Sequence, residues 1–478
     1  MSEAEQPTIG DDVTETIPVS AVEWDVATDV LVAGAGGTGL VAALAACENP
    51  DLTVTVLEKA PDPGGNTALS TGMIPAAGTR LQEAKGIEET PEDMVRDILE
   101  KNGHEADEAM VRHLAAESVN LIHWLVDDWD VTLHLVDDFK YPKHSEFRMH
   151  APAGNNGENL VAELVDLLRA QPNVELLTNT LVTKLVHDDG RVVGVVAGSR
   201  REEAIECRKV VLATDGFAGN KRMVRDFCDE EIVDALYFGS DGNTGDGIRF
   251  GAELGGDLAY MDSYQGHATV AHQTGMLSTY AIIMNGGILV NVDGDRFGDE
   301  SAGYSEFAID VLRQPGGVAF ELFDERIFEK LQGQFDDFDD AVELGAYDHA
   351  DTVAALCVVI GCAPDAATAA VERYNAAVAD GDPDEVGRTD GVHTLSPPFY
   401  GTKITGSLFH TQGGLVVDGD ARVLRADDTP VENLYAGGGV ACGISGHGAG
   451  GYLSGNGLTA ALGLGRLAGI HARKSLSE

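Results

Sequence analysis

Basic residues are scarce in this chain of 478 residues, which has 32 lysines and arginines against 79 aspartates and glutamates. The formal net charge is therefore −47 at pH 7. Such a surface repels phosphate backbones and anionic lipid headgroups, so nucleic acids and membrane surfaces are poor candidates for partners. The acidity is typical either of a protein adapted to a salty cytoplasm or of an acidic protein from a GC-rich bacterium, and both interpretations stay open.

Long hydrophobic runs and paired cysteine motifs are also missing. No stretch of about 18 apolar residues occurs, so no membrane span is expected. Residues 1–24 are acidic and lack the basic and apolar regions of a signal peptide, so we expect a short flexible tail on a cytoplasmic protein. The six cysteines form no C-x-x-C motif, which argues against a zinc ribbon, a c-type haem or an iron–sulfur cluster, and no metal site is expected.

A glycine-rich turn follows the first expected strand. Gly34, Gly36 and Gly39 form G-x-G-x-x-G, and an Ala- and Leu-rich helix leads to a second strand over 53–57 that ends at Glu58. In such a β-α-β unit the first glycine permits the tight turn, the second lets a pyrophosphate approach the backbone, and the third lets helix and strand pack closely. Glu58 can accept a hydrogen bond from a ribose hydroxyl, which favours FAD or NAD over NADP.

The loop after this strand is rich in glycine and hydroxyl groups. Residues 63–72 read PGGNTALSTG and offer backbone N–H groups together with Asn66, Thr67 and Ser70. Such a loop can run along a diphosphate and a ribityl chain, which favours FAD. A simple polar turn is the alternative interpretation.

Several long motifs in order resemble the FAD-dependent fumarate reductase/succinate dehydrogenase flavoprotein superfamily, which includes 3-ketosteroid dehydrogenases. They are VAGAGGTGL at 32–40, LEKAPDPGGNTALSTG at 57–72, VVLATDGFAGN at 210–220, TGDGI at 244–248, GGILVNVDGDRFGDE at 286–300, FHTQGGLVVD at 409–418 and NLYAGGGVACGISGHGAGGYLSGNGL at 433–458. The resemblance implies an α/β fold. A Rossmann-like FAD-binding domain of the two-dinucleotide-binding type would cover 25–261 and 410–478, with an inserted α+β clamp (cap) domain over 262–409.

The resemblance also implies how FAD is held. Some family members link FAD to a histidine in the loop after the second strand, and none occurs between Pro61 and Arg80, so we expect noncovalent FAD. A helix expected over 458–471 would aim its first N–H groups at the flavin C2 carbonyl and N1. The cofactor-binding residues implied by the motifs are Gly34, Gly36, Gly37, Thr38, Gly39, Glu58, Lys59, Gly65, Asn66, Thr67, Ser70, Gly72, Ala213, Thr214, Asp246, Gly438, Gly439, Gly455, Asn456 and Leu458.

The substrate end departs from fumarate reductases, whose arginines grip dicarboxylates and donate a proton. Tyr304 stands where R-F-x-N-E-x-x-x-R has its last arginine, and Tyr452 where H-G-A-N-R-L-G-G-N has its arginine. A phenol is a neutral donor suited to a ketone oxygen, and it can act as an acid or a base. The two tyrosines with Ser454 resemble the 3-ketosteroid Δ4-dehydrogenase branch.

That branch implies an FAD-dependent desaturase that introduces a C=C bond α,β to a ketone, in a 3-ketosteroid or a smaller cyclic ketone. Tyr452 would hydrogen-bond the ketone oxygen, Tyr304 would remove the α-proton with Ser454 tuning it, and a hydride would pass to flavin N5. The two tyrosine roles can be exchanged. His410 is a further catalytic candidate, because fumarate reductases place a substrate-binding histidine at that position.

Other polar residues leave the substrate open. His267, Arg148 and His150 are candidate donors, and a pocket that held them all would suit a smaller cyclic ketone or a keto acid. Glu300 is expected either to bridge clamp and site or to be exposed. One alternative function is a fumarate reductase-like enone or enoate reductase, which runs the reaction in reverse. Another is a non-catalytic flavin electron-transfer protein, against which the phenol pair argues. The electron acceptor and the oligomeric state stay open.

Overall fold

The fold comes from a computed structural model that describes residues 15–477. Residues 1–14 of the expected flexible tail lie outside the described residues. Thr16–Pro18 forms strand β1, which pairs in parallel with β8 (Val182–Asp188). The expectation of a tail is wrong for this part of residues 1–24, because the β-branched Thr16 and Ile17 extend the edge of a sheet.

The larger sheet carries the nucleotide-binding pattern expected from the first glycine motif. Within residues 15–477 its strands run in the order β1-β8-β9-β10-β2-β3-β7, with β20 beside the end of β10 and β19 beside β20. Strands β10, β2, β3 and β7 pair in parallel, and the hairpin expected around 188–190 is confirmed as the antiparallel pair β8–β9. The bounds not yet given are β2 Val26–Ala33, β3 Val54–Leu57, β7 Val174–Leu177, β9 Arg191–Ala197, β10 Glu203–Leu212, β19 Arg422–Leu424 and β20 Pro430–Ala436.

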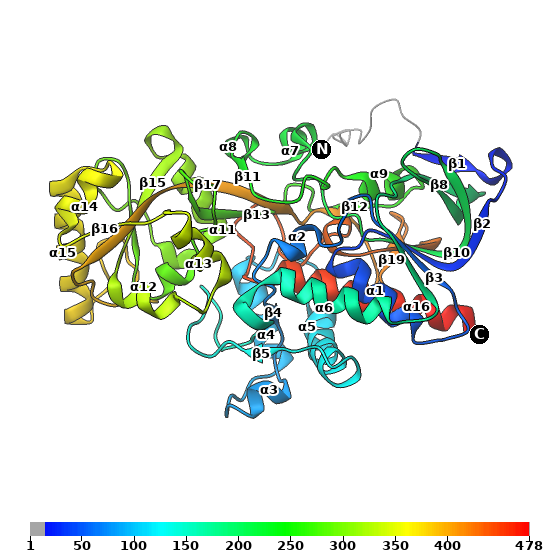
Figure 1. The fold of residues 1–478 in the computed structure, drawn as a ribbon, viewed down its shortest axis with the longest axis horizontal. Helices are drawn as coiled ribbons and strands as arrows, with labels where there is room; N and C mark the ends of the chain where they lie inside the picture. The colour runs from blue at the N-terminus through cyan, green and yellow to red at the C-terminus, as the bar shows by residue number, and fades with distance from the viewer. Residues whose placement is uncertain (1–14, 478) are drawn as a thin grey trace.

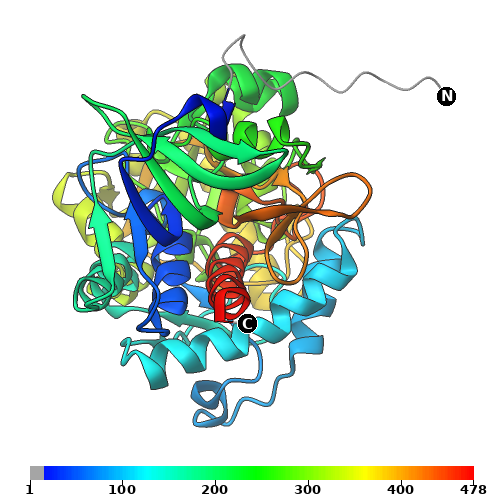
Figure 2. The same cartoon turned by 90° about the vertical axis from the view of Figure 1, so that its right-hand side faces the viewer.

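Two helices far apart in the sequence pack tightly against this sheet. Helix α1 (Gly37–Cys47) is buried along its whole length and lies beside α16 (Asn456–Ser477), the helix expected over 458–471. A Cβ atom at Gly469 would lie 2.2 Å from the Ala42 carbonyl oxygen, so glycine lets the two helices approach this closely. Figure 2 shows α16 end-on below the sheet. The first and last segments of the FAD-binding fold therefore form one core.

The second sheet is formed mostly by strands of the segment expected to be the clamp, with β11 contributed by the segment before it. Its strands run in the order β11-β17-β15-β14, with β13 and β16 also paired to β17. Figure 1 shows β17 crossing from the clamp toward the centre of the molecule. The strand followed by a helix expected over 317–332 is confirmed as β15 and α12, and the helices expected on both sides of Pro364 are confirmed as α14 and α15. The bounds are β11 Leu236–Tyr237, β13 Tyr264–Ala271, β14 Ile288–Val290, β15 Val318–Asp324, β16 Asp348–Ala350, β17 Phe399–Thr411, α10 Ala281–Met284, α11 Tyr304–Leu312, α12 Glu325–Leu331, α13 Asp336–Glu343, α14 Val353–Ile360 and α15 Pro364–Asp380.

The remaining elements cover the sheets or connect them. The helical segment expected over 88–130 is observed as α4 and α5, followed by a π-helical turn at Trp124–Asp128. No helix among residues 15–477 is long and apolar enough to cross a membrane. The other bounds are α2 Gly65–Ala68, α3 Arg80–Glu83, α4 Pro91–Lys101, α5 Glu108–His123, α6 Gly157–Arg169, α7 Lys221–Phe227, α8 Glu230–Val233, α9 Asp246–Glu253, β4 Ile74–Pro75, β5 His134–Leu135, β6 Met149–Ala151, β12 Leu258–Ala259 and β18 Gly414–Leu415.

Candidate active site

Three turns at one edge of the larger sheet surround a pocket. Strands β2 and β20 both run parallel to β10, so the carboxyl ends of the three strands open at the same edge. The turns that follow contain Gly34, Thr214 and Gly438, which all line the pocket. Gly34 has a φ of 108°, and a Cβ atom there would lie 2.2 Å from the Ala213 carbonyl oxygen, so this turn requires glycine.

Most of the residues predicted to bind a cofactor line this pocket. They are Gly34, Gly36, Gly37, Thr38, Glu58, Lys59, Gly65, Asn66, Thr67, Ser70, Ala213, Thr214, Asp246, Gly438, Gly439, Gly455 and Leu458. The structure places three others elsewhere. A Cβ atom at Gly39 would lie 1.9 Å from the Gly34 carbonyl oxygen, which is the helix–strand packing that the motif predicts. Gly72 packs against Pro152, and Asn456 donates a hydrogen bond to Ser445 Oγ at 3.1 Å, so both contact other parts of the protein instead.

One end of the pocket fits a dinucleotide. Helix α1 begins at Gly37, where the helix dipole favours a diphosphate, and the space beside Gly36 is open, since a Cβ atom there meets nothing closer than 3.5 Å. The Glu58 carboxylate is held in place by the backbone N–H groups of Ala35 and Ala60, both at 2.8 Å. A carboxylate fixed at this end of the pocket can accept ribose hydroxyl donors.

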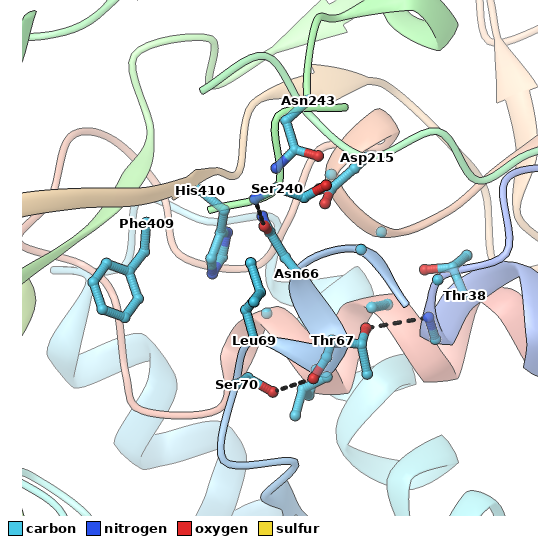
Figure 3. Close-up of a pocket in the computed structure, with 18 of the residues that line it drawn as sticks. Thr38, Asn66, Thr67, Leu69, Ser70, Asp215, Ser240, Asn243, Phe409 and His410 are labelled. Atoms are coloured by element: carbon cyan, nitrogen blue, oxygen red, sulfur yellow. Dashed lines mark hydrogen bonds between the residues drawn. The ribbon is translucent and has the colours of Figure 1, made fainter. Parts of the chain in front are cut away.

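Asn66 supplies a polar group that none of residues 15–477 satisfies. Its Oδ1 accepts the Ser240 N–H at 2.8 Å, and its Nδ2 is buried without a partner (Figure 3). Thr67 Oγ1 accepts the Gly37 N–H at 3.1 Å, which ties the hydroxyl-rich loop to the start of α1. A buried donor without a partner is costly unless a ligand satisfies it, so the loop also fits a bound cofactor.

The two tyrosines predicted to carry the chemistry lie next to each other at the other end of the pocket, with their ring planes tilted by 60°. Their ring centroids are 6.0 Å apart, and both side chains are buried and line the pocket with Ser454. Burial raises the pKa of Tyr452 to about 12. Burial raises the pKa of Tyr304 well above 10, with the Tyr452 and Tyr141 phenols adding to it and a hydrogen bond with Ser454 opposing it. Both phenols are therefore neutral at pH 7.

Two histidines line the same end of the pocket, and the Nε2 atom is a donor in one and an acceptor in the other. The Nδ1 of His267 accepts the Thr269 N–H at 3.2 Å, which leaves the ring proton on Nε2 as a donor. The Nδ1 of His410 faces the Thr411 carbonyl at 3.3 Å and donates to it, which leaves Nε2 as an acceptor. Burial lowers the pKa of His267 to about 3, and burial also lowers the pKa of His410, against the opposing charge of Asp215.

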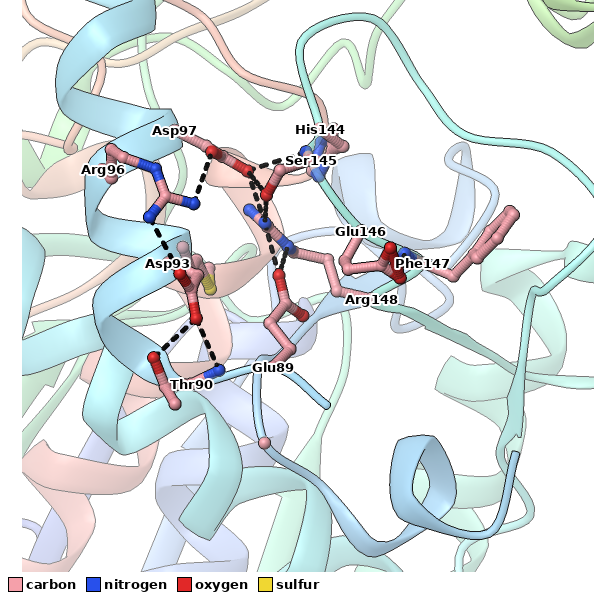
Figure 4. A network of polar contacts seen from close by, with 12 residues as sticks. Glu89, Thr90, Asp93, Arg96, Asp97, His144, Ser145, Glu146, Phe147 and Arg148 are labelled. Carbon is pink, nitrogen blue, oxygen red and sulfur yellow. Dashed lines mark hydrogen bonds and ion pairs between the residues drawn. The ribbon is translucent and has the colours of Figure 1, made fainter. Parts of the chain in front are cut away.

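Arg148 and His150 do not line the pocket, so the prediction that they add donors there is wrong. Arg148 is fully buried and pairs with Glu89 and Asp97, as Figure 4 shows. The His150 ring bonds to Thr79 Oγ1 at 2.8 Å. The sequence gives no sign that these carboxylates meet the guanidinium, and a buried arginine needs such partners.

Glu300 is neither exposed nor part of the pocket lining. Its carboxylate is fully buried and accepts from Arg296 Nη2 at 2.6 Å, with Arg388 Nη1 at 3.4 Å. Among the described residues that line the pocket there is no arginine, and the one lysine, Lys59, pairs with Asp246 at 2.9 Å. The places of the family's arginines are thus not refilled from elsewhere in this part of the chain.

Several pocket residues escape prediction from the sequence. Tyr141 and Tyr280 lie edge-on to Tyr304, with ring centroids 6.1 Å and 5.4 Å away. Phe409 stacks on His267 at 4.9 Å, and its place beside His410 in the FHTQGG motif is the one signal that marks it. Tyr141 lies in an irregular segment with no motif or period, so nothing in the sequence points to it.

Comparison with known proteins agrees with this arrangement. The family profile described as "FAD binding domain" matches residues 29–458. A probable fumarate reductase of Shewanella frigidimarina is 31% identical over 461 residues, which are 94% of this chain and 75% of that protein. The urocanate reductase of Eggerthella lenta is 29% identical and is matched over 86% of this chain and 69% of its own length.

Solved structures extend the comparison. The open conformation of a flavocytochrome c3 fumarate reductase matches with a TM-score of 0.78 and 30% identity, over 96% of this chain and 80% of that one. The 3-ketosteroid-Δ4-(5α)-dehydrogenase of Rhodococcus jostii, solved with 4-androstene-3,17-dione, matches with a TM-score of 0.74 and 28% identity, over 95% and 99%. The chain therefore belongs to the fumarate reductase/succinate dehydrogenase flavoprotein superfamily, and its cofactor is FAD.

Proposed function

We propose that this protein oxidises the CH–CH bond next to a neutral ketone, in a 3-ketosteroid or a smaller cyclic ketone, and yields the α,β-unsaturated ketone. The observation that carries the proposal is the neighbouring pair Tyr304 and Tyr452, with ring centroids 6.0 Å apart in a pocket that no arginine lines among the described residues. When bound, the flavin takes up the hydride. The chain's own residues must bind the carbonyl and move the proton.

Tyr452 is the group that we assign to the carbonyl oxygen. It lies beside the first turn of α16, since a Cβ atom at Gly457 would lie 3.5 Å from its hydroxyl, and the nearby Gly457 backbone lowers its pKa, in opposition to burial. The first N–H groups of a helix have no partner within the helix, and they carry a partial positive charge. A phenol and a helix start on one oxygen would stabilise the negative charge that develops there when the α-proton leaves.

Tyr304 is the group that we assign to the α-proton. It stands at the start of α11, and the nearby Ser454 side chain lowers its pKa, in opposition to burial. The ring of His267 stacks on it at 4.8 Å and holds the phenol in place. A base fixed in this way suits proton transfer to or from a carbon atom.

The residues that line the pocket beside the tyrosine pair suit a neutral substrate that contains a ring. Tyr280, Phe409 and Leu277 line this end together with the tyrosine pair, and they offer apolar surface to a flat ring. The Nε2–H of His267 adds one neutral donor. A dicarboxylate would bring two charges into a site without a permanent cation to match them.

A second candidate is the reverse reaction, reduction of an enone. Both phenols are neutral at pH 7, because burial raises their pKa values, so each is ready to donate a proton to the α-carbon. The relatives named above include enzymes described as fumarate reductase and urocanate reductase. In this direction Tyr304 would protonate the carbon atom that it deprotonates in the forward reaction.

An anaerobic absorbance experiment tests the proposal. Loss of the oxidised flavin spectrum on addition of a saturated 3-ketone supports desaturation. Rapid reoxidation of the dithionite-reduced protein by a cyclic enone, without bleaching by any ketone, favours the reductase. Reoxidation by fumarate but not by enones would overturn the assignment of a neutral carbonyl substrate. If no ketone, enone or fumarate changes the flavin spectrum, the remaining hypothesis is a non-catalytic flavin electron-transfer protein.

A further inference from the structure

Asp215 occupies an unusual backbone position inside the pocket. It follows strand β10, lines the pocket and has a φ of 64°, in the left-handed region that favours glycine. A side chain there costs conformational energy, and such positions cluster at functional sites. Its Oδ1 accepts the Gly216 N–H at 2.8 Å, and no described residue forms a hydrogen bond or ion pair with its Oδ2.

Gly439 leaves the space that the Asp215 carboxylate fills. A Cβ atom at Gly439 would lie 2.5 Å from Asp215 Oδ1 and 2.4 Å from the Gly216 nitrogen. Any side chain at 439 would therefore collide with the aspartate or its turn. Two strands that end side by side, β10 and β20, thus place one carboxylate between them.

The carboxylate lies between the two ends of the pocket. On one side, Gly438 abuts the first turn of α1, since a Cβ atom there would lie 2.5 Å from Thr38 Oγ1. On the other side, Gly216 abuts Thr411, whose Oγ1 also accepts the Phe217 N–H at 2.9 Å. Thr411 is next to His410 at the tyrosine end, and Figure 3 shows Asp215 between Thr38 at the start of α1 and His410.

We propose that the Asp215 carboxylate accepts a hydrogen bond from a hydroxyl group of the ribityl chain of FAD. This chain joins the diphosphate to the flavin ring, so it must cross the middle of the pocket. A carboxylate is only an acceptor, and the ribityl hydroxyls are the donors that FAD offers there. At the other end of the cofactor, Glu58 would accept a hydrogen bond from a ribose hydroxyl in the same way. The inference rests on FAD binding and not on the identity of the substrate.

The test compares FAD with its 2′-, 3′- and 4′-deoxyribityl analogues, bound to apoprotein and followed by quenching of flavin fluorescence. We expect Asp215→Gly to weaken FAD binding about 10- to 100-fold, the usual range for a hydrogen bond to a charged group. For one of the three analogues the same substitution should change the affinity less than about threefold, because the hydroxyl partner is already missing. Asp215→Asn keeps an acceptor oxygen and should show a smaller loss of FAD affinity. Asp241→Asn, an exposed aspartate outside the pocket lining, is the control for charge and should bind FAD normally.

The melting temperature of the apoprotein distinguishes a role of Asp215 in binding the ribityl chain from a purely structural role. Because glycine tolerates a φ of 64° better than aspartate does, Asp215→Gly apoprotein should melt at the parent temperature or above it. Equal losses of affinity for FAD and for all three analogues would overturn the proposal. So would a variant whose apoprotein is destabilised while its FAD affinity, measured below the melting transition, is unchanged.

Discussion

The ring of His267 lies on the ring of Tyr304, with centroids 4.8 Å apart and an angle of 30° between their planes. Phe409 stacks on the same imidazole at 4.9 Å. The phenol at the start of α11 is thereby fixed against strands β13 and β17, which bear the other two rings. Under the proposed function, this stack holds Tyr304 in place as the proton donor or acceptor, and the contribution of its hydroxyl can be measured directly.

Replacement of Tyr304 by phenylalanine should slow flavin reduction by a ketone substrate by about 10²- to 10⁴-fold, the usual loss when a general acid or base is removed. The ring stack and the flavin spectrum should persist, because only the hydroxyl is lost. Stopped-flow absorbance under anaerobic conditions measures the rate. Tyr400→Phe, the same change in the clamp outside the pocket lining, is the matched control. Near-parental rates in Tyr304→Phe would remove this residue from the mechanism.

The desaturation rate should rise with pH. Burial, with the Tyr452 and Tyr141 phenols, raises the pKa of Tyr304 well above 10, so the basic form is a small fraction that grows about tenfold per pH unit below that pKa. Enone reduction uses the neutral phenol and should not rise over the same range. Rates measured from about pH 7 to about pH 9.5 check the slope. A flat profile for desaturation would argue against a tyrosine base.

Gly36→Val should fold and yet fail to retain FAD. A Cβ atom at Gly36 meets only the Gly64 carbonyl oxygen, at 3.5 Å, so the protein tolerates a side chain that projects into the diphosphate space. The flavin-to-protein absorbance ratio after purification and a circular dichroism spectrum give the two readouts. Gly450→Ala, where a Cβ atom meets nothing within 4 Å, should behave as the parent. A Gly36→Val protein that retains a full complement of FAD would contradict the placement of the diphosphate.

Glu321→Gln should stabilise the protein at alkaline pH. Glu321 is fully buried in β15, none of the residues that the structure describes forms a hydrogen bond with its Oε1, and burial raises its pKa from 4.5 to about 8. The folded state therefore binds this proton more tightly than the unfolded chain does, and the resulting stability is present below pH 4.5 and is lost as the pH rises to about 8.

The glutamine variant carries no such charge, so it should be more stable than the parent by on the order of a few kcal/mol at pH 8 to 9 and nearly equal near pH 5. Urea unfolding at both pH values measures the difference. Glu343→Gln, an exposed carboxylate on α13, should show no such dependence on pH. A lower stability of Glu321→Gln at pH 9 would show that the carboxylate is paired or solvated in solution.

Salt should stabilise the fold. A net charge of −47 destabilises a compact chain through self-repulsion, and salt screens charges that are more than a Debye length apart. We expect the melting temperature to rise as KCl increases from about 0.05 to about 0.5 M, a range in which screening dominates. Calorimetric scans with sucrose in place of KCl control for general solute effects. A melting temperature insensitive to KCl would remove self-repulsion as a factor.

The parts of the fold that the sequence predicts are those with local causes. Gly34, Gly36 and Gly39 mark a turn whose geometry tolerates little else, and the strands beside it are short apolar runs. The tyrosine pair was predicted through its place in two motifs, Tyr304 in one and Tyr452 in the other. Their approach to 6.0 Å depends on how the clamp sits on the sheet, which no local pattern encodes.

The residues that the sequence misplaces or misses are those whose positions depend on contacts between distant parts of the chain. Arg148 was predicted to face the substrate, but it pairs with Glu89 and Asp97, which come from a loop and a helix earlier in the chain. Tyr141 was missed because it lies in an irregular segment and reaches the pocket only through tertiary packing. Long-range pairing of a buried charge, and the path of an irregular segment, are set by the whole fold and leave no periodic trace in the sequence.

Strand β17 joins the clamp sheet to the wall of the pocket. It is hydrogen-bonded along the clamp sheet and ends with Phe409, His410 and Thr411 in the pocket wall. A larger ring system that tilted the clamp would therefore displace an imidazole and a phenyl ring at the reaction centre. Under the proposed function, substitutions that admit a bulkier ring must therefore keep the end of β17 in place, because Phe409 and His410 belong to it.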